Sequence, residues 1–545
     1  MSGGSLVSNG FNLGSDATCN LTAPTDRTGA DAKLQPLALN APGDTPTHAL
    51  ASDSPAINQV TYSYNGCGTT VSIDQRGADR LKGIKCDSGA YEAEQPALDC
   101  TPPYQVGSDA ALNEAILCIN DAGPGNHTID LTGPITLSGP ATPFLNSQAT
   151  EITVTGNGHE VDGDGRGTVF TVGPQTAVHM SEISVTGGQG SSGINHNEGG
   201  GFFVQGELTL TQATIDGNSA VTGGGLSVDG EAGPAMVTIL ETLITNNHAT
   251  VTGGGLNVAG TLGQATVSLT DSSVSNNTSD DMGGGLNVSG RGGKTLVTVS
   301  DSTIGDNQAR TGGGVFVNGG SGGTAEIALT GSTLSGNSAS TNGGAMVING
   351  NLGQATASFL NSTVSGNQAG KGGGAIVNSG NGGTAVLEAD YTTFTDNSAG
   401  SDGLLQSGSA ATATFTASIL SGPGNVDLCD INGGEVSSGD YNISSDTSCN
   451  LTGSADLTGV NAGLEPLALN LPGTTWTHAL NEDSPALDRI PDGNGGCGTA
   501  VATDQRGVTR PQPAGGQCDS GAYELGNDTP PPVESYEVFL PVGMK

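Results

Sequence analysis

The sequence predicts an all-β protein whose central part is a right-handed, single-stranded parallel β-helix, a β-solenoid with three strands in each coil of about 30 residues. Asparagine and apolar residues recur at intervals of thirty residues through the middle of the chain. A fixed period of this length is typical of solenoids and other repeat architectures. Within each repeat the apolar residues alternate with period two, as in Val267-Ser-Leu269, which indicates strands. Glycine accounts for 91 of the 545 residues, which disfavours helices.

Turn residues separate the short strands within each repeat. Gly, Asn, Ser and Asp tolerate the left-handed backbone that tight turns require. A propeller blade would need about 40 residues and four strands, so the β-helix is the favoured architecture. Because equivalent residues stack at the strand spacing of ~4.8 Å, the recurring asparagines are predicted to form a ladder of side-chain amides. The predicted ladder consists of Asn247, Asn277, Asn307, Asn337, Asn367 and Asn397.

The composition restricts the kinds of partner. The net charge is −38, with only 15 Lys and Arg residues. Binding to nucleic acid requires a basic face, so the charge excludes nucleic acid as a partner and argues against an anionic polysaccharide. No apolar run approaches the length of a membrane span, so none is expected. Hydrophobic residues make up 34% of the chain, which is enough for the thin core of a solenoid.

A segment near the start of the chain is repeated near its end. Residues 5–92 match residues 435–524, with an offset of 430 (449 − 19) that becomes 432 (518 − 86) after a two-residue insertion. We therefore expect the chain to begin within the last part of one module and then to contain a second, complete module. The predicted parts are the cap of a preceding module at 1–98, an N-terminal cap with irregular first coils at 99–198, regular coils at 199–400, a second C-terminal cap at 401–525, and a Pro-rich linker with a tail at 526–545.

Nine cysteines without a Cys-x-x-Cys metal pair indicate disulfides and an oxidising, extracellular environment. Cys19 is left without a partner, since the counterpart of Cys429 would lie before Met1. We interpret Cys19 as the remnant of a truncation or of processing, with a free thiol or a link to another subunit as alternatives. The predicted pairs, which pin the caps, are Cys67–Cys86, Cys100–Cys118, Cys429–Cys449 and Cys497–Cys518.

The repeated segment resembles a known family. His478-Ala-Leu, then Ser484-Pro-Ala-x-Asp488, Asp504-Gln-Arg-Gly507 and Cys518-Asp-x-Gly-Ala-Tyr-Glu524 look like the choice-of-anchor Q domain of bacterial secreted β-helix proteins. The Gly-Gly-Gly-[Leu/Val] and Ser-x-[Ile/Val]-x-x-Asn repeats are similar to polymorphic outer-membrane adhesins, and residues 111–116 resemble the head region of such modules. The resemblance implies an extracellular, surface-attached β-helix protein and implies no reaction. The tail from Tyr536 resembles the endings of other secreted bacterial proteins and leaves the route of attachment open.

Two acidic groups are candidates for structural calcium, the only cofactor that the sequence suggests. Glu241, Asp271 and Asp301 lie on successive coils, and like charges about 5 Å apart either raise a pKa or recruit a cation. Asp162 and Asp164 resemble half of a calcium loop but lack its bidentate glutamate. For both groups the alternative is an ordinary turn. The acidic column supports that alternative, because it continues as residues that no shared site requires.

The predicted function is structural: a surface stalk, adhesin or filament-forming subunit from a tandem array of modules, without catalysis. The expected partners are other copies of the module, through head-to-tail association, and a glycan or host-cell ligand. The alternatives are a polysaccharide lyase or hydrolase and a carbohydrate-binding β-helix without catalysis. The four basic residues of the regular coils fall at scattered repeat positions without an acidic column beside them, so no residue is assigned as catalytic. They are Arg291, Lys294, Arg310 and Lys371.

His478, Ser484 and Asp504 have the residue types of a catalytic triad. However, Ser484 precedes Pro485 and lies in no nucleophile elbow. We expect structural roles instead, with Asp504 paired to Arg506 and with His478 bonded to the backbone.

Overall fold

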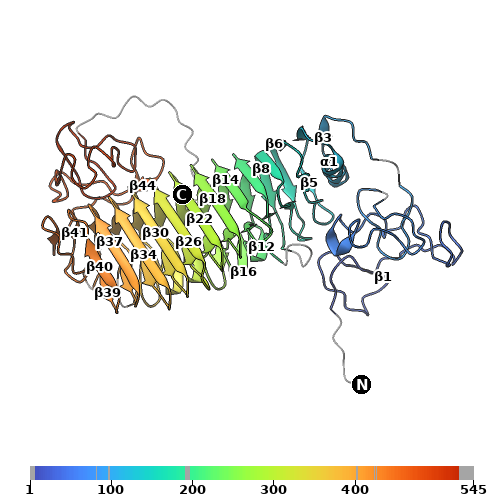
Figure 1. Ribbon diagram of the computed structural model, residues 1–545, viewed down its shortest axis with the longest axis horizontal. Helices are drawn as coiled ribbons and strands as arrows, with labels where there is room; N and C mark the ends of the chain where they lie inside the picture. Colours follow the sequence, from blue (N-terminus) through green and yellow to red (C-terminus); the bar gives the residue numbers. More distant parts are fainter. Residues whose placement is uncertain are drawn as a thin grey trace, which may run out of the picture. The chain divides into compact units, whose positions relative to one another are not determined.

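A computed structural model describes residues 7–81, 83–95, 98–190, 197–400, 403–422, 424 and 426–526 of the chain (Figure 1). Apart from residue 526, the predicted linker and tail at 526–545 lie outside the described residues. The chain divides into two compact units, and each is described by itself. The first comprises Met1–Thr209 and Ala213–Ser227, and the second comprises Leu210–Gln212 and Val228–Lys545.

The first unit contains the N-terminal copy of the cap and the first coils. The strands β3, β4, β6, β8 and β11 pair in that order, and all of these pairings are parallel. The elements are β1 (Leu13–Gly14), β2 (Arg27–Thr28), η1 (Tyr64–Gly66), β3 (Tyr104–Val106), α1 (Asp109–Asp121), β4 (Asn126–Leu131), β5 (Ile135–Thr136), β6 (Glu151–Asp162), β7 (Phe170–Val172), β8 (Ala177–Thr186) and β9 (Phe202–Val204). The chain continues with β10 (Glu207–Thr211), β11 (Thr214–Asp216), β12 (Ser219–Thr222) and β13 (Leu226–Asp229).

The helix α1 is an element that the repeat pattern did not predict. Ser108 caps it by accepting a hydrogen bond from the Ala111 amide, and Asp109 follows in the first turn. Leu112, Ile116 and Ile119 are completely buried at helical spacing. The helix lies outside the thirty-residue repeat, so the periodicity that identifies the coils says nothing about it.

In the second unit the coils contribute to three parallel sheets, of which the second ends at β32 (Gln368–Ala369), and this confirms the predicted β-helix with three-sided coils (Figure 1). Pairing joins residues thirty positions apart, as in Val237, Val267 and Val297. A bend divides the first strand of each coil into two segments. The segments before the bend are β14 (Ala235–Leu240), β18 (Gln264–Thr270), β22 (Lys294–Ser300), β26 (Thr324–Thr330), β30 (Gln354–Leu360), β34 (Thr384–Asp390) and β37 (Ala411–Thr416). Those after the bend are β15 (Leu243–Thr245), β19 (Ser273–Ser275), β23 (Thr303–Gly305), β27 (Thr333–Ser335), β31 (Thr363–Ser365), β35 (Thr393–Thr395) and β38 (Ile419–Leu420).

The other two sheets complete each coil. The second sheet contains β16 (His248–Thr252), β20 (Thr278–Ser279), β24 (Gln308–Thr311), β28 (Ser338–Asn342) and β32 (Gln368–Ala369). The third contains β17 (Leu256–Ala259), β21 (Leu286–Ser289), β25 (Val315–Asn318), β29 (Met346–Asn349), β33 (Ile376–Ser379), β36 (Leu405–Ser407) and β39 (Cys429–Ile431).

The bend in the first strand explains one recurring column of residues. Glu241, Asp271 and Asp301 have φ values of 47°, 48° and 49°, and the equivalent position in each later coil is also left-handed. Asp, Asn and Gly adopt this backbone most readily. The turn therefore accounts for the acidic column without a ligand.

The core is a column of stacked aliphatic residues inside the three sheets. Val237, Val267, Val297 and Ile327 are fully buried and lie in register on successive coils. Towards the end of the stack aromatic rings enter the neighbouring core columns, and Phe394 packs edge-on against Phe359 and Phe415. Each Å² of apolar surface that is buried contributes about 25 cal/mol to the free energy of folding. This column is therefore the main stabilising contribution to the coils.

The coils continue beyond residue 400 to β39, so the second cap begins after Ile431 and not at residue 401 as predicted. It lies along the flank of its own β-helix (Figure 1). It has little regular structure, so its stability depends on side-chain contacts and disulfides. Its short strands are β40 (Glu435–Ser438), β41 (Ile443–Ser444), β42 (Leu457–Thr458), β43 (Ala468–Leu469), β44 (Trp476–Thr477), β45 (Ile490–Pro491) and β46 (Gln517–Cys518).

Candidate functional site

The predicted asparagine ladder is confirmed. Each side-chain amide donates to the carbonyl oxygen of the asparagine on the next coil, with N–O distances of 2.9–3.1 Å from Asn247 to Asn397. The backbone N–H of Asn307 donates to the same oxygen of Asn337 at 3.1 Å, and its Nδ2 also donates to the carbonyl of Val274 at 2.9 Å. The six asparagines are at most 2% exposed. The ladder thus satisfies buried polar groups in each turn, which would be costly to leave unpaired.

The four predicted disulfides are also confirmed, and each closes a loop of 18 to 21 residues. Cys100–Cys118 joins the chain before β3 to the helix α1, and Cys429–Cys449 joins the last coil to the second cap. Cys19 is the remaining cysteine; it is exposed and carries a free thiol. A loop of this length stabilises the folded state by ~3 kcal/mol through the chain entropy of the unfolded state.

The acidic column is placed as the repeat predicts. Burial and the charge of Glu241 raise the pKa of Asp271, and burial and the charge of Asp271 raise the pKa of Asp301. Glu241 also accepts a hydrogen bond from Gln212 at 2.8 Å. Within the described parts of the chain, no group of three or more His, Cys, Asp and Glu residues could hold a metal ion. Calcium at this column stays a prediction, and the left-handed turn is the simpler explanation.

The second acidic group forms a closed turn. The backbone N–H of Asp164 donates to the Asp162 carboxylate at 2.8 Å, and Arg166 pairs with Asp164 at 2.8 Å. Because both carboxylates already have protein partners, the arrangement is that of a turn with a local ion pair.

A groove of about 510 Å³ lies across four neighbouring strands of the third sheet. Its floor contains Phe316, Val347 and Val377, which lie in register on β25, β29 and β33. Phe316 and Val347 are each only 5% exposed, so little of their apolar surface faces solvent. Six of the lining side chains are amides: Asn342, Asn349, Asn378, Asn381, Gln406 and Asn432.

The amides give the groove hydrogen-bonding capacity that the protein does not use. Among the described residues, the side-chain carbonyl oxygen of Asn349 has no hydrogen-bond partner. Asn378 instead lies in the inward column with Val317 and Ile348, and its amide donates to the carbonyl of Thr412 at 2.7 Å. At one rim, Arg310 pairs with Asp281. An apolar floor with a few convergent amides suits a neutral hydroxylated ligand better than a charged one.

Sequence reasoning missed this groove, although it left a signal. The outward position of the third strand is Asn257 and Asn287 in the early coils and becomes Phe316, Val347 and Val377 in the later ones. A change from amide to apolar residues at one outward repeat position marks where the groove begins.

The second cap contacts the coils through several side chains of one face. Thr475 Oγ1 donates to the carbonyl of Gly331 at 2.8 Å, and Gln505 accepts from Thr363 Oγ1 at 2.6 Å. Since His478 Nδ1–H donates to the carbonyl of Glu465 at 2.7 Å, its Nε2 accepts from Ser365 Oγ at 2.8 Å. His478 thus bonds to the backbone, as expected. Further contacts join Asn361 to Thr503 and Thr393 to Ala522.

The docked cap explains why the acidic column stops. The column positions Gly331, Asn361, Tyr391 and Ala417 are all buried, whereas the acidic positions before them are exposed. A carboxylate beneath the cap would lose its hydration without a partner. Acidic residues therefore occupy the turn only on the coils that the cap leaves uncovered.

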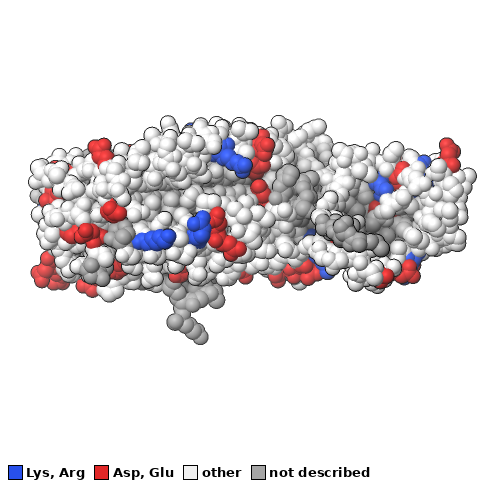
Figure 2. Space-filling model, turned by 90° about the horizontal axis from the view of Figure 1, so that it is seen from below, with Lys and Arg blue, Asp and Glu red and all other residues white. Residues whose placement is uncertain are grey.

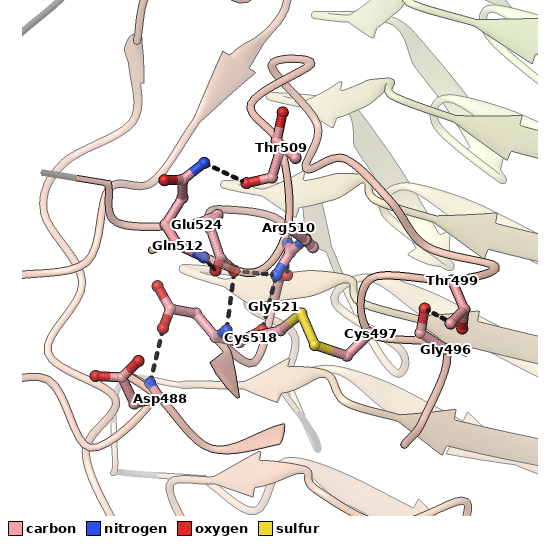
Figure 3. The surroundings of a disulfide bond; sticks show 11 residues. Asp488, Gly496, Cys497, Thr499, Thr509, Arg510, Gln512, Cys518, Gly521 and Glu524 are labelled. Carbon is pink, nitrogen blue, oxygen red and sulfur yellow. Dashed lines mark hydrogen bonds and ion pairs between the residues drawn. A yellow bond between two sulfur atoms is a disulfide. The ribbon is translucent and has the colours of Figure 1, made fainter. Parts of the chain in front are cut away.

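An ion-pair cluster lies beside the Cys497–Cys518 disulfide (Figure 3). Arg510 is fully buried, pairs with Glu524 at 2.8 Å and lies 4.6 Å above the ring of Tyr391. Burial raises the pKa of Glu524 to about 7 despite the neighbouring arginine. The predicted pair of Arg506 with Asp504 is present at 2.7 Å. Because these carboxylates bind arginines and backbone amides of the protein itself, we interpret the cluster as structural.

Charged groups are spread over the face drawn in Figure 2. On the face drawn in Figure 2, acidic side chains are scattered, and several basic ones lie beside acidic ones. No helix in the described ranges is long and apolar enough to cross a lipid bilayer.

Neither a protein-family model nor a curated protein matches this chain.

Proposed function

We propose that this chain is an extracellular structural β-helix protein that acts as a stalk, adhesin or filament-forming subunit at a cell surface. The observation that carries this proposal is the asparagine ladder from Asn247 to Asn397, which links six coils by buried hydrogen bonds. Each coil adds ~4.8 Å of length with the same bonding. Such a stack extends without a globular core and resists local opening.

The disulfides support an extracellular location. Four disulfides persist in oxidising compartments and are rare in the reducing cytosol. The resemblance of the two caps to the choice-of-anchor Q domain points the same way.

The test uses cells of the organism that encodes the chain. Antibody should label intact cells, and the 545-residue chain purified by itself should yield one reactive thiol before reduction and nine after it. Electron microscopy of the native protein should show rods or fibres. Labelling only after permeabilisation, together with nine reactive thiols in the freshly isolated protein, would contradict the proposal.

A second candidate, a carbohydrate-binding β-helix without catalysis, is supported by the groove. Glycoside hydrolases use a pair of carboxylates, whereas this groove presents amides and an apolar floor. Affinity electrophoresis in neutral and acidic polysaccharides tests it. Retardation by a neutral polysaccharide should weaken in Asn349→Ala and Gln406→Ala but persist in Gln264→Ala, which lies outside the groove. Equal retardation of all three variants would rule out the groove.

A further inference from the structure

The two copies of the cap share their internal contacts. In each copy an asparagine amide bonds to the threonine seven residues later, and a serine hydroxyl donates to a carbonyl 22 residues earlier. Each copy also holds an Asp–Arg pair whose guanidinium lies over a tyrosine ring. Residues of one copy therefore identify their structural equivalents in the other. The matching residues are Asn40 and Asn470, Ser54 and Ser484, Asp74 and Asp504, Arg76 and Arg506, and Tyr91 and Tyr523.

The second copy buries one face against the coils. Thr475, His478 and Gln505 are 2%, 3% and 4% exposed, and each bonds to a coil residue. The amides of Gly521 and Ala522 bond to a carbonyl and to a threonine hydroxyl of the coils at 2.7 and 3.0 Å. This face is thus complementary to the flank of a β-helix.

The same face of the first copy is exposed to solvent. Val71 is 45% exposed, whereas its equivalent Val501 is 7% exposed. A methyl group added to Gly521 would lie 2.6 Å from a coil isoleucine, but one added to Gly89 would meet nothing within 4 Å. We call this surface the open cap face. It consists of Thr45, His48, Val71, Gln75, Gly89 and Ala90, all of them exposed.

The side chains of the open cap face already hold their docked arrangement. Gln75 Nε2 donates to Thr45 Oγ1 at 3.0 Å and to the carbonyl of residue 46 at 3.3 Å, as Gln505 does to Thr475 and to the carbonyl of residue 476. His48 Nδ1 donates to a backbone carbonyl at 2.7 Å, which is the same distance as in the second copy. Such preorganisation lowers the entropic cost of binding.

Exposed apolar side chains are concentrated in this copy. Among the described residues, twelve large hydrophobic side chains are exposed, and six of them belong to the first cap. One of them, Val71, belongs to the open cap face, and exposed apolar residues that lie together mark interaction surfaces. The six are Val7, Leu34, Leu37, Leu39, Val71 and Ile73.

We propose that the open cap face docks on the flank of β-helix coils contributed by a preceding module of the same polypeptide. The expected contacts match those of the second copy. A coil threonine donates to the Gln75 carbonyl, a coil serine donates to His48 Nε2, and the amides of Gly89 and Ala90 donate to coil oxygens. Cys19, the equivalent of Cys449, then pairs with a cysteine of the last coil.

The opposite side of the first cap contacts the helix α1 and the first coils. Lys85 is 1% exposed and pairs with Asp109 of α1 at 3.3 Å, and Thr61 Oγ1 donates to the carbonyl of Pro140 at 2.9 Å. The equivalent of Lys85 is the exposed Gln517. The first cap therefore carries two docking sides and acts as a connector between successive modules. This inference rests on the two copies and not on cellular location, so it can fail independently of the proposed surface function.

The test extends the full chain. A copy of residues 99–430 is placed directly before Met1, which restores the spacing of the second copy. Amide exchange at Gly89 and Ala90 should slow at least about tenfold compared with the present chain. The single reactive thiol, that of Cys19, should disappear because it pairs with the copied cysteine. Gln75→Ala should reduce the protection in the extended chain and change nothing in the present one.

A second chimera keeps the test informative if the first chimera does not fold. Residues 431–524 of the full chain are replaced by residues 1–92, so that the first cap takes the place of the second. Protection of Gly89 and Ala90 with oxidation of Cys19 in either chimera supports the proposal. Failure of both chimeras to show these changes overturns it. So does protection of the two amides in the present chain, since another segment or a second copy would then cover the face.

Discussion

Gln505→Ala is expected to weaken the docking of the second cap on the coils, whereas the matched Gln75→Ala is expected to be nearly neutral. Gln505 is 4% exposed, and its amide bonds to Thr333, Thr475 and the carbonyl of Trp476 while it accepts from Thr363.

The magnitude depends on which groups lose a partner. Thr333 keeps a hydrogen bond, because its hydroxyl donates to the carbonyl of Trp476 at 2.7 Å. The Thr363 hydroxyl loses its acceptor and stays buried, which costs about 1–3 kcal/mol, and the small cavity adds to this. We therefore expect a loss of roughly 2–4 kcal/mol in the free energy of cap docking. Substitution of the exposed Gln75 should change stability by less than about 0.5 kcal/mol.

The assay is urea unfolding followed by tryptophan fluorescence. Trp476 is the only tryptophan, and its backbone carbonyl accepts from the coil residue Thr333, so its emission is expected to change when the cap leaves the coils. Circular dichroism follows the coils in the same samples. The fluorescence midpoint should fall in Gln505→Ala while the dichroism midpoint changes less. Equal shifts in the two glutamine variants, or none in Gln505→Ala, would refute the assignment of Gln505 as a docking contact.

Three further predictions concern protonation and the ladder. Burial holds the pKa of His478 below its ordinary 6.5. The contribution of His478 to cap stability is therefore complete above pH 6.5 and falls as the pH drops towards the folded-state pKa. In urea titrations from pH 5 to 8, His478→Gln should remove this pH dependence and His48→Gln should leave it unchanged. Asn307→Ala should cost about 3 kcal/mol in urea unfolding, because buried backbone groups lose their partners, whereas the exposed neighbour Gln308 tolerates alanine. The raised pKa of Asp271 means that coil stability declines as the pH rises above the ordinary 3.8, and Asp271→Asn should flatten this decline in thermal melts without calcium. A decline that calcium does not affect in the wild type would exclude a calcium site there.

The repeat made most of the fold predictable. Val237, Val267 and Val297 stack in the structure at the spacing of the sequence, because each coil repeats the same backbone path. The ladder and the disulfide pairs were predictable from spacing in the same way. The helix α1 was not, since it occurs once and lies outside the repeat, and the groove was not, because it depends on which outward positions meet across four coils.

The sequence by itself determined the period, the residues that face the core and the equivalence of the two caps. Only the tertiary structure decided which surfaces are covered. Gln75 and Gln505 have the same neighbours in sequence, yet one is exposed and the other is buried. The physical reason is that burial depends on the segment that packs against a residue, and here that segment is a coil flank more than 140 positions away.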